Sequence, residues 1–171
     1  SDVCSSDLPA EPAFAGFRTW VDRYDRATES ERSSLETEGV ALARRRREEL
    51  RDLIGSDPRR ALELAVPHSV RGRLPGAVVA ELEQRVEGQG DFEVLAAVAP
   101  AGAEGTTPAM FRKVVMDGRR FTASTYGQRM FQPTLFGVPL HGIAVDDQMA
   151  LAESPIRRLE GSEIAELGLN V

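Results

Sequence analysis

The chain has 171 residues, of which 42% are hydrophobic and 28% are charged, a composition typical of a folded globular protein rather than a wholly disordered one. Its formal net charge of −6 argues against nucleic acid or an anionic membrane surface as the main partner, and no apolar run reaches the roughly 18 residues of a membrane span. A single cysteine, Cys4, excludes an intrachain disulfide and a zinc site built from thiolates.

The first eight residues, SDVCSSDL, resemble the translated read-through of a sequencing adapter. Segments of this kind are set aside before a fold is inferred. We therefore expect residues 1–10 to be a disordered or artefactual terminus, and we expect Cys4 not to belong to the native protein.

Helical patterns dominate residues 11–88. Apolar side chains at spacings of three and four predict an amphipathic helix over 11–24 and a second helix over about 35–54. Asp57 and the proline after it are a helix-start signal, because aspartate caps a helix and proline is tolerated in the first turn. A short third helix follows, and a fourth is expected over 75–88. The apolar face of this fourth helix would consist of Val78, Val79, Leu82 and Val86.

The apolar period then changes from about 3.6 to 2, which predicts strands. Alternation over 92–98 gives the first strand, and the dipeptide Asp117-Gly118 predicts a hairpin between strands 110–116 and 119–126. A second hairpin is expected around Asp146-Asp147, with strands 137–145 and 148–153. A last short strand is expected over 156–159 and a closing helical turn after it.

Helices followed by strands indicate the α+β class. We expect about four helices in a region spanning 11–88, then a small antiparallel β-meander or barrel over 91–160 that packs with the helices as one unit. Residues 161–171 would form a short helical turn and tail.

Arginine occupies four successive positions at 44–47, inside the second predicted helix. Successive helical residues are about 100° apart, so this run spreads around the helix instead of forming a stripe. Glu48 and Glu49 follow Arg44 and Arg45 at the i, i+4 spacing of weak helical ion pairs. The run is therefore interpreted as a solvated helix face rather than as a nucleic-acid or phosphate site.

No strong catalytic, cofactor or metal motif is found. His141 shares a strand face with apolar residues, and Asp146 and Asp147 follow in the next turn, so these three are the only candidates for catalysis or metal binding. The aspartates are also explained by the turn itself. His68 lies in a helix break without a nucleophile motif around it. A phosphate-binding loop of the Walker type is excluded, because it needs a lysine after its second glycine and Lys113, the only lysine, lies within a predicted strand.

The link between the two predicted hairpins is apolar and poorly periodic, with Phe131, Leu135 and Phe136 close together. Core packing explains most aromatic residues of the chain. Any part of this link that is exposed would form an apolar patch, and such patches mark docking surfaces for other domains.

Three stretches carry a resemblance to a known class of proteins: residues 41–47 (ALARRRR), 57–67 (DPRRALELAVP) and 139–145 (PLHGIAV). They resemble the N-terminal region of large, secreted, multidomain bacterial proteins, whose later parts carry metalloprotease, lectin-like or adhesion repeats. The resemblance implies an exported protein. It transfers no catalytic residue, because the motifs consist of packing and capping residues.

The leading functional hypothesis is a non-catalytic N-terminal module of a longer exported protein, serving docking, folding assistance or anchoring of downstream domains of the same chain or of another protein. A second hypothesis is a small stand-alone enzyme of the hydrolase type, which would use His141 with the acids of the hairpin turns. A third is a small β-barrel that binds oligonucleotides through its strands. No cofactor and no metal is expected.

Overall fold

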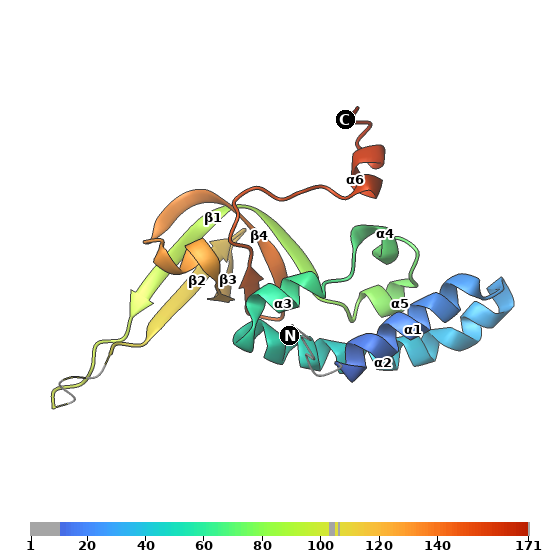
Figure 1. Cartoon of the computed structure of the whole chain (residues 1–171), viewed down its shortest axis with the longest axis horizontal. Coiled ribbons are helices and arrows are strands. Elements are labelled where there is room, and N and C mark those ends of the chain that lie inside the picture. Colours follow the sequence, from blue (N-terminus) through green and yellow to red (C-terminus); the bar gives the residue numbers. More distant parts are fainter. Residues whose placement is uncertain (1–10, 103–104, 106, 171) are drawn as a thin grey trace, which may run out of the picture.

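The computed structural model describes residues 11–102, 105 and 107–170, so the expected terminus 1–10 lies outside the described residues. The helices gather on one side of the molecule and the strands curl into a barrel on the other (Figure 1). The α+β class with helices first is confirmed, but the described residues form six α-helices instead of about four. None of these helices combines the length and apolar character that crossing a membrane requires. The elements are, in order, α1 (Pro12–Arg26), α2 (Glu29–Ser56), α3 (Pro58–Glu63), α4 (His68–Arg71), α5 (Gly76–Val79), β1 (Gln84–Ala96), β2 (Met110–Met116), β3 (Arg119–Ser124), the 3-10 helix η1 (Gly127–Phe131), β4 (Leu135–Val145), β5 (Gln148–Leu151) and α6 (Gly161–Glu166).

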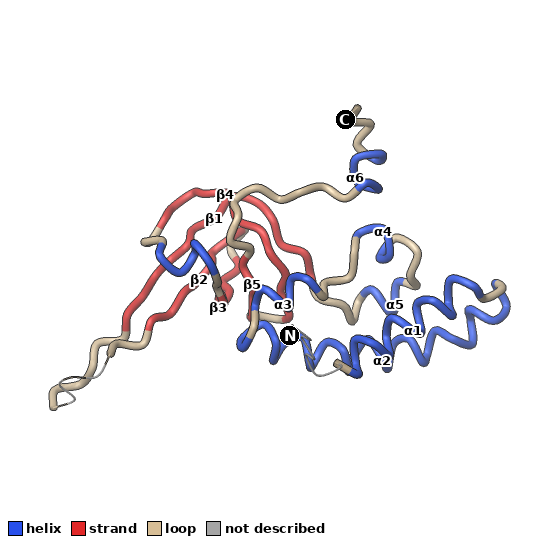
Figure 2. Tube along the Cα trace, viewed as in Figure 1, coloured by secondary structure: helices blue, strands red, loops and turns tan. Residues whose placement is uncertain are grey.

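Helices α1 and α2 form a long pair that buries the predicted apolar face of α1 (Figure 2). Trp20 is fully buried and donates its indole N–H to the carbonyl oxygen of Leu35 at 3.0 Å. The indole lies against Gly39, where an added Cβ would overlap the ring, so the glycine permits the close approach of the two helices. Helix α2 begins before the expected Leu35, because Thr28 and Glu31 form a capping box at its start.

Of the short helices between α2 and the barrel, α3 and α5 begin close to the predicted positions, whereas α4 was not predicted and begins at His68, where a helix break was expected. The carboxylate of Asp57 accepts a hydrogen bond from a first-turn backbone N–H of α3 at 3.1 Å, which confirms the predicted cap. The helix expected over 75–88 is wrong beyond its first turn, because α5 ends at Val79 and β1 begins at Gln84. Val86 therefore belongs to a strand paired with β4, and this long-range pairing outweighs a four-residue apolar spacing.

The five strands close into a barrel in the order β1-β2-β3-β5-β4. Of the two predicted alternatives the barrel is thus correct, although β3 and β5 pair in parallel rather than antiparallel. Strand β1 is long enough to pair with β4 through its first half and with β2 through its second half. The change of partner coincides with an irregularity between Gly90 and Phe92, where a Cβ on Gly90 would collide with the carbonyl oxygen of Val115.

Both predicted hairpins are present, between β2 and β3 and between β4 and β5. Asp117 and Asp146 occupy the first turn positions with φ of 51° and 55°, a conformation that aspartate tolerates better than most residues. The strand expected over 156–159 does not form, because this segment leaves the barrel and runs without regular structure to α6.

The helical half and the barrel share a buried core. Seven residues from the two halves form one apolar cluster: Phe14, Leu50, Ile54 and Ala61 from the helices and Ile143, Val145 and Ala150 from the barrel. An ion pair also joins the halves, with Arg47 Nη2 of α2 at 2.7 Å from Asp146 Oδ1 of the β4–β5 turn. The helices therefore pack directly on the outer face of β4 and β5.

Candidate functional site

His141, the strongest catalytic candidate of the sequence, lies half-buried on the outer face of β4. Its Nε2 donates a hydrogen bond to the backbone carbonyl oxygen of Ser154 at 2.8 Å, which leaves Nδ1 as the acceptor of a neutral ring. Burial lowers the pKa of His141, and the nearby positive charge of Arg157 acts in the same direction. The ring is therefore neutral at pH 7 and fixed in place by the chain that follows the barrel.

The structure does not bring Asp146 and Asp147 to His141. Asp146 lies five residues further along an extended strand, which corresponds to about 16 Å, and its carboxylate pairs with Arg47 of α2. The backbone carbonyl of Asp147 accepts a hydrogen bond from Thr122 N–H at 2.8 Å and helps to close the barrel. The carboxylate beside His141 is instead Glu87, directly opposite it on β1.

A cleft of about 440 Å³ surrounds His141 between the barrel, α3 and the segment leading to α6. Its charged groups neutralise one another. Arg157 contacts Glu87 Oε2 at 2.5 Å and Glu163 Oε1 at 2.9 Å, and Arg85 lies 3.5 Å from Glu160. Hydrogen bonds from Arg157 and from the backbone N–H of Glu160 lower the pKa of Glu163 to about 2.

This arrangement favours attachment over catalysis. A hydrolase of the expected type requires His141 and the acids of the hairpin turns to lie together at one site. Among the described residues the imidazole of His141 has a hydrogen bond only to the Ser154 carbonyl, while His68 Nε2 lies 3.1 Å from Glu166 Oε2. No group of three metal-ligating side chains gathers in the described part of the chain. The cleft thus fastens the last segment to the barrel and to α4, and its geometry gives the hydrolase hypothesis no support.

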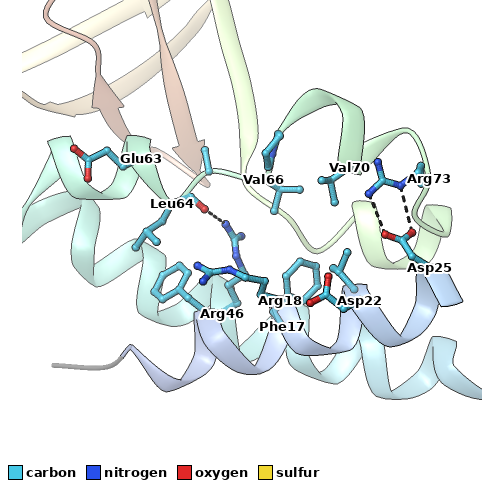
Figure 3. Close-up of a pocket in the computed structure, with 14 residues that line it drawn as sticks. Phe17, Arg18, Asp22, Asp25, Arg46, Glu63, Leu64, Val66, Val70 and Arg73 are labelled. Atoms are coloured by element: carbon cyan, nitrogen blue, oxygen red, sulfur yellow. Dashed lines mark hydrogen bonds and ion pairs between the residues drawn. The ribbon is translucent and has the colours of Figure 1, made fainter. Parts of the chain in front are cut away.

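A second cavity, of about 310 Å³, lies between α1 and the extended chain that joins α3 to α4 (Figure 3). Its walls are largely apolar, with Phe17 on one side and Leu64, Val66 and Val70 on the other. At one end Arg73 forms two hydrogen bonds with the Asp25 carboxylate, at 3.0 and 3.2 Å.

The floor of this cavity carries a buried charge network that the sequence did not reveal. Arg46 is 2% exposed, and its guanidinium donates to Glu83 Oε2 at 2.5 Å and to the carbonyl oxygen of Leu64 at 2.7 Å. Glu83 also contacts Arg71 at 3.0 Å and accepts the backbone N–H of Val66 at 2.7 Å. Burial alone would raise the pKa of Glu83, but the two guanidinium groups and the N–H hold it below its ordinary value.

The arginine run at 44–47 is therefore only partly a solvated face. Three of the four arginines form ion pairs with residues that are distant in the chain. These pairs are Arg44 with Glu81, the buried Arg46 with Glu83, and Arg47 with Asp146. The expected pairs with Glu48 and Glu49 are not among the ion pairs of the described residues. Partners 37 and 99 residues away leave no signal in the local sequence.

The clearest exposed feature lies at the end of the barrel remote from the helices, where β1 and β2 extend as an arm (Figure 2). Leu95 and Phe111 face each other across this arm, and η1 and the start of β4 add further apolar side chains. Phe131 is 90% and Phe136 71% exposed, so this part of the apolar link is at the surface. We refer to six exposed side chains of this region together as the apolar end: Leu95, Met110, Phe111, Met130, Phe131 and Phe136. Met110 and Phe111 point to opposite faces of β2, so the apolar end includes both faces of the arm.

Similarity to known proteins does not assign this geometry to a function. No family model matches the chain, no curated protein matches it, and no solved structure matches it.

Proposed function

We propose that the chain is a non-catalytic docking module of a longer exported protein, in which the apolar end holds a neighbouring protein domain. The observation that carries the proposal is the exposure of six large apolar side chains at one end of the barrel. Large contiguous apolar surfaces are rare on monomers and mark interaction sites. Export rests on the resemblance to secreted bacterial proteins.

The size of the apolar end suits a protein partner. Its six large side chains are between 46% and 90% exposed, and side chains of this size contribute to the roughly 800 Å² per partner that a standard protein–protein interface buries. The charges beside it are of both signs: Glu93 lies opposite Lys113 on the arm, and Arg120 is 4.0 Å from Glu93. A mixed rim of this kind complements a folded domain better than it complements a polyanion or an anionic membrane.

The test compares the 171-residue chain with the protein encoded by the complete reading frame. We expect amide hydrogen exchange at residues 110–112 and 130–136 to be slower in the longer protein, because a docked domain would cover them. Phe131→Ser combined with Phe136→Ser should abolish this protection, whereas the control Ile156→Ser, at a site 75% exposed, should keep it. Unchanged exchange in the longer protein, or protection in the wild-type chain alone through self-association, would contradict the proposal.

A second candidate is the binding of single-stranded oligonucleotides. Its support is the barrel itself, because five strands closed in the order β1-β2-β3-β5-β4 have the connectivity of the oligonucleotide- and oligosaccharide-binding architecture. Phe111 and Lys113 lie on the outer face of β2, the combination of stacking ring and cation that such binding uses. Architecture alone assigns no function, and the acidic chain disfavours this candidate.

The two candidates differ in their dependence on salt. Oligonucleotide binding predicts an affinity for labelled oligo(dT) that falls steeply as salt rises, measured by fluorescence anisotropy. If no binding occurs at low salt, the oligonucleotide candidate is excluded and the docking proposal is unaffected.

A further inference from the structure

Residues 154–170, which follow the barrel and include α6, are attached to the rest of the molecule with almost no apolar burial (Figure 1). We call this segment the C-terminal strap. None of the described residues of α6 is buried, and the large apolar side chains Ile156, Leu159, Leu167 and Leu169 are exposed. Burial of apolar surface is the main favourable contribution to protein contacts. The strap therefore depends on polar contacts for its position.

Four described residues outside the strap hold it through ion pairs and hydrogen bonds: His68, Arg85, Glu87 and His141. Ion pairs at a protein surface contribute little to stability and are screened by salt. The barrel, in contrast, encloses an apolar cluster contributed by all five strands. Detaching the strap thus costs far less free energy than opening the barrel.

The closest contact of the strap is made by Arg157, which lies in the cleft around His141. Its Nε and Nη2 donate to the two carboxylate oxygens of Glu87 on β1, at 2.5 and 3.4 Å, and its Nη1 lies 2.9 Å from Glu163 Oε1. Glu163 belongs to the strap itself, so the contact with Glu87 is the one that joins Arg157 to the barrel. A guanidinium that engages both oxygens of one carboxylate is the geometry by which arginine recognises an acid.

The cleft beneath the strap is accessible from solvent. The Glu87 side chain is 57% exposed even while Arg157 contacts it. Arg85 lies two residues before Glu87 on β1, lines the same cleft and is 3.5 Å from Glu160 of the strap. The cleft therefore presents one carboxylate and one guanidinium, and the strap supplies the complementary pair, Arg157 and Glu160.

We propose that the strap is a releasable, autoinhibitory occupant of this cleft, and that a partner protein displaces it with an arginine that binds Glu87 and an acid that binds Arg85. The partner segment carries the acid three residues after the arginine, the spacing of Arg157 and Glu160 in the strap. A lysine in place of the arginine is a poorer match, because an ammonium is a point charge and does not pair with both carboxylate oxygens at once. The inference concerns a surface separate from the apolar end and does not depend on the proposed docking function.

The test adds a fluorescent synthetic peptide with the sequence of residues 154–167 to the full 171-residue chain at low salt and follows its anisotropy. The tethered strap competes with the peptide at a high effective concentration, so binding to the wild-type chain should be weak. Arg157→Gln in the chain removes the contact of the tethered strap with Glu87 and should raise the affinity for the peptide about tenfold. The matched control is Arg158→Gln, because Arg158 is exposed and takes part in no ion pair with the described residues; this variant should behave as the wild type.

Variants of the peptide test the chemistry of the partner on the Arg157→Gln chain. Replacing the arginine of position 157 by glutamine or lysine should weaken binding about tenfold, whereas glutamine at position 158 should leave it unchanged. A peptide that keeps only the arginine of 157 and the glutamate of 160, with alanine elsewhere, should still bind. Adding Glu87→Gln to the Arg157→Gln chain should abolish binding, and NMR shifts of the amides of residues 84–88 and 140–142 should locate the peptide in the cleft.

Equal affinity of the peptide for the wild-type and Arg157→Gln chains would overturn the inference, as would binding that survives Glu87→Gln. Failure of every peptide to bind the Arg157→Gln chain would also overturn it. Light scattering separates a further outcome: a dimer of the Arg157→Gln chain that the peptide dissociates would assign the cleft to exchange of straps between two copies and would overturn the partner. Each of these results leaves the proposed docking at the apolar end unaffected.

Discussion

The helical half and the barrel each bury an arginine, and they treat it in opposite ways. In the helical half, Arg46 meets a buried glutamate, a backbone carbonyl and a second arginine on that glutamate. In the barrel, Arg129 lies over the Phe92 ring and donates to a carbonyl and an amide oxygen, and one of its nitrogens has no hydrogen-bond partner among the described residues.

The difference separates a buried charge with a complete set of partners from a buried charge whose set is incomplete. A complete buried network is costly to break and fixes the positions of the elements it joins. It therefore holds α2, the chain before α4 and the start of β1 together. The incomplete network leaves a donor without a partner among the described residues, and it lies next to Met130 and Phe131, which are 51% and 90% exposed. In the proposed docking function, the helical half is the scaffold and the far end of the barrel contacts the partner.

The largest expected effect breaks the complete network. Glu83→Gln leaves Arg46 and Arg71 without their buried anion, so the free energy of unfolding should fall by about 3–5 kcal/mol in urea titrations. The control Glu38→Gln removes an exposed pair with Arg23 and should change stability by less than about 1 kcal/mol. A loss below about 1 kcal/mol for Glu83→Gln would show that the network does not hold the scaffold.

The second expected effect tests how tightly the scaffold is packed. Alanine normally stabilises a helix relative to glycine, but a Cβ at Gly39 would overlap the Trp20 ring. We therefore expect Gly39→Ala to lower the free energy of unfolding by about 1–3 kcal/mol. Gly55 lies in the same helix with nothing within 4 Å of an added Cβ, so Gly55→Ala should stabilise by about 0.5–1 kcal/mol. Effects of equal sign at the two sites would contradict this view of the helix pair.

The third effect is small and sharpens the contrast between the two arginines. Arg129→Met removes an unpaired buried charge together with two hydrogen bonds, and these contributions oppose each other. We expect the free energy of unfolding to change by less than about 1 kcal/mol. Arg46→Met should cost about 3–5 kcal/mol, because it leaves Glu83 short of its main partner. Similar losses for both variants would remove the distinction between scaffold and binding surface.

The smallest effect concerns the attachment of α6. The pKa of Glu163 is lowered from its ordinary value of 4.5 to about 2 by Arg157 and by the Glu160 N–H. The ionised carboxylate therefore stabilises the folded state at every pH above about 4.5. That contribution should be lost progressively as the pH falls from about 5 to about 2. The protection of the α6 amides from hydrogen exchange, relative to their intrinsic rates at each pH, should therefore fall in this window before that of the barrel amides. Glu163→Gln should weaken the attachment at pH 7 and flatten the pH profile; an unchanged profile would show that other contacts hold α6.

Local signals predicted much of the fold. Asp57 before proline gave the start of α3, and Asp117-Gly118 gave the β2–β3 hairpin, because caps and turns depend on neighbouring residues. The start of β1 was missed because Leu82 and Val86 have a helical spacing, while pairing with β4 decides the structure. The parallel pairing of β3 with β5 has no local signature at all.

The candidate sites were less accessible to sequence reasoning than the fold. The link without periodicity left open whether Phe131 and Phe136 are exposed, and the structure shows that both are. The acid beside His141 is Glu87, and the sequence pointed to Asp146, because only the strand register shows which residue lies opposite. Arg46 looked like one of four surface arginines, and its burial depends on Glu83, 37 residues away. Long-range partners of charged groups are therefore the part that a single sequence does not predict.

The parallel pairing of β3 with β5 also has a consequence for the order of folding. Thr122 pairs with Gln148, so the barrel closes only after η1 and all of β4 have been laid down between them. Contacts between residues this distant in the chain form slowly, because the chain loses the entropy of loop closure before strand pairing compensates for that loss. The helix pair needs only neighbouring segments and can form early. During synthesis, α1 and α2 would fold before β5 has been synthesised, while β1, β2 and β3 cannot yet close the barrel. The apolar interior of the barrel would therefore be removed from solvent in a single late step.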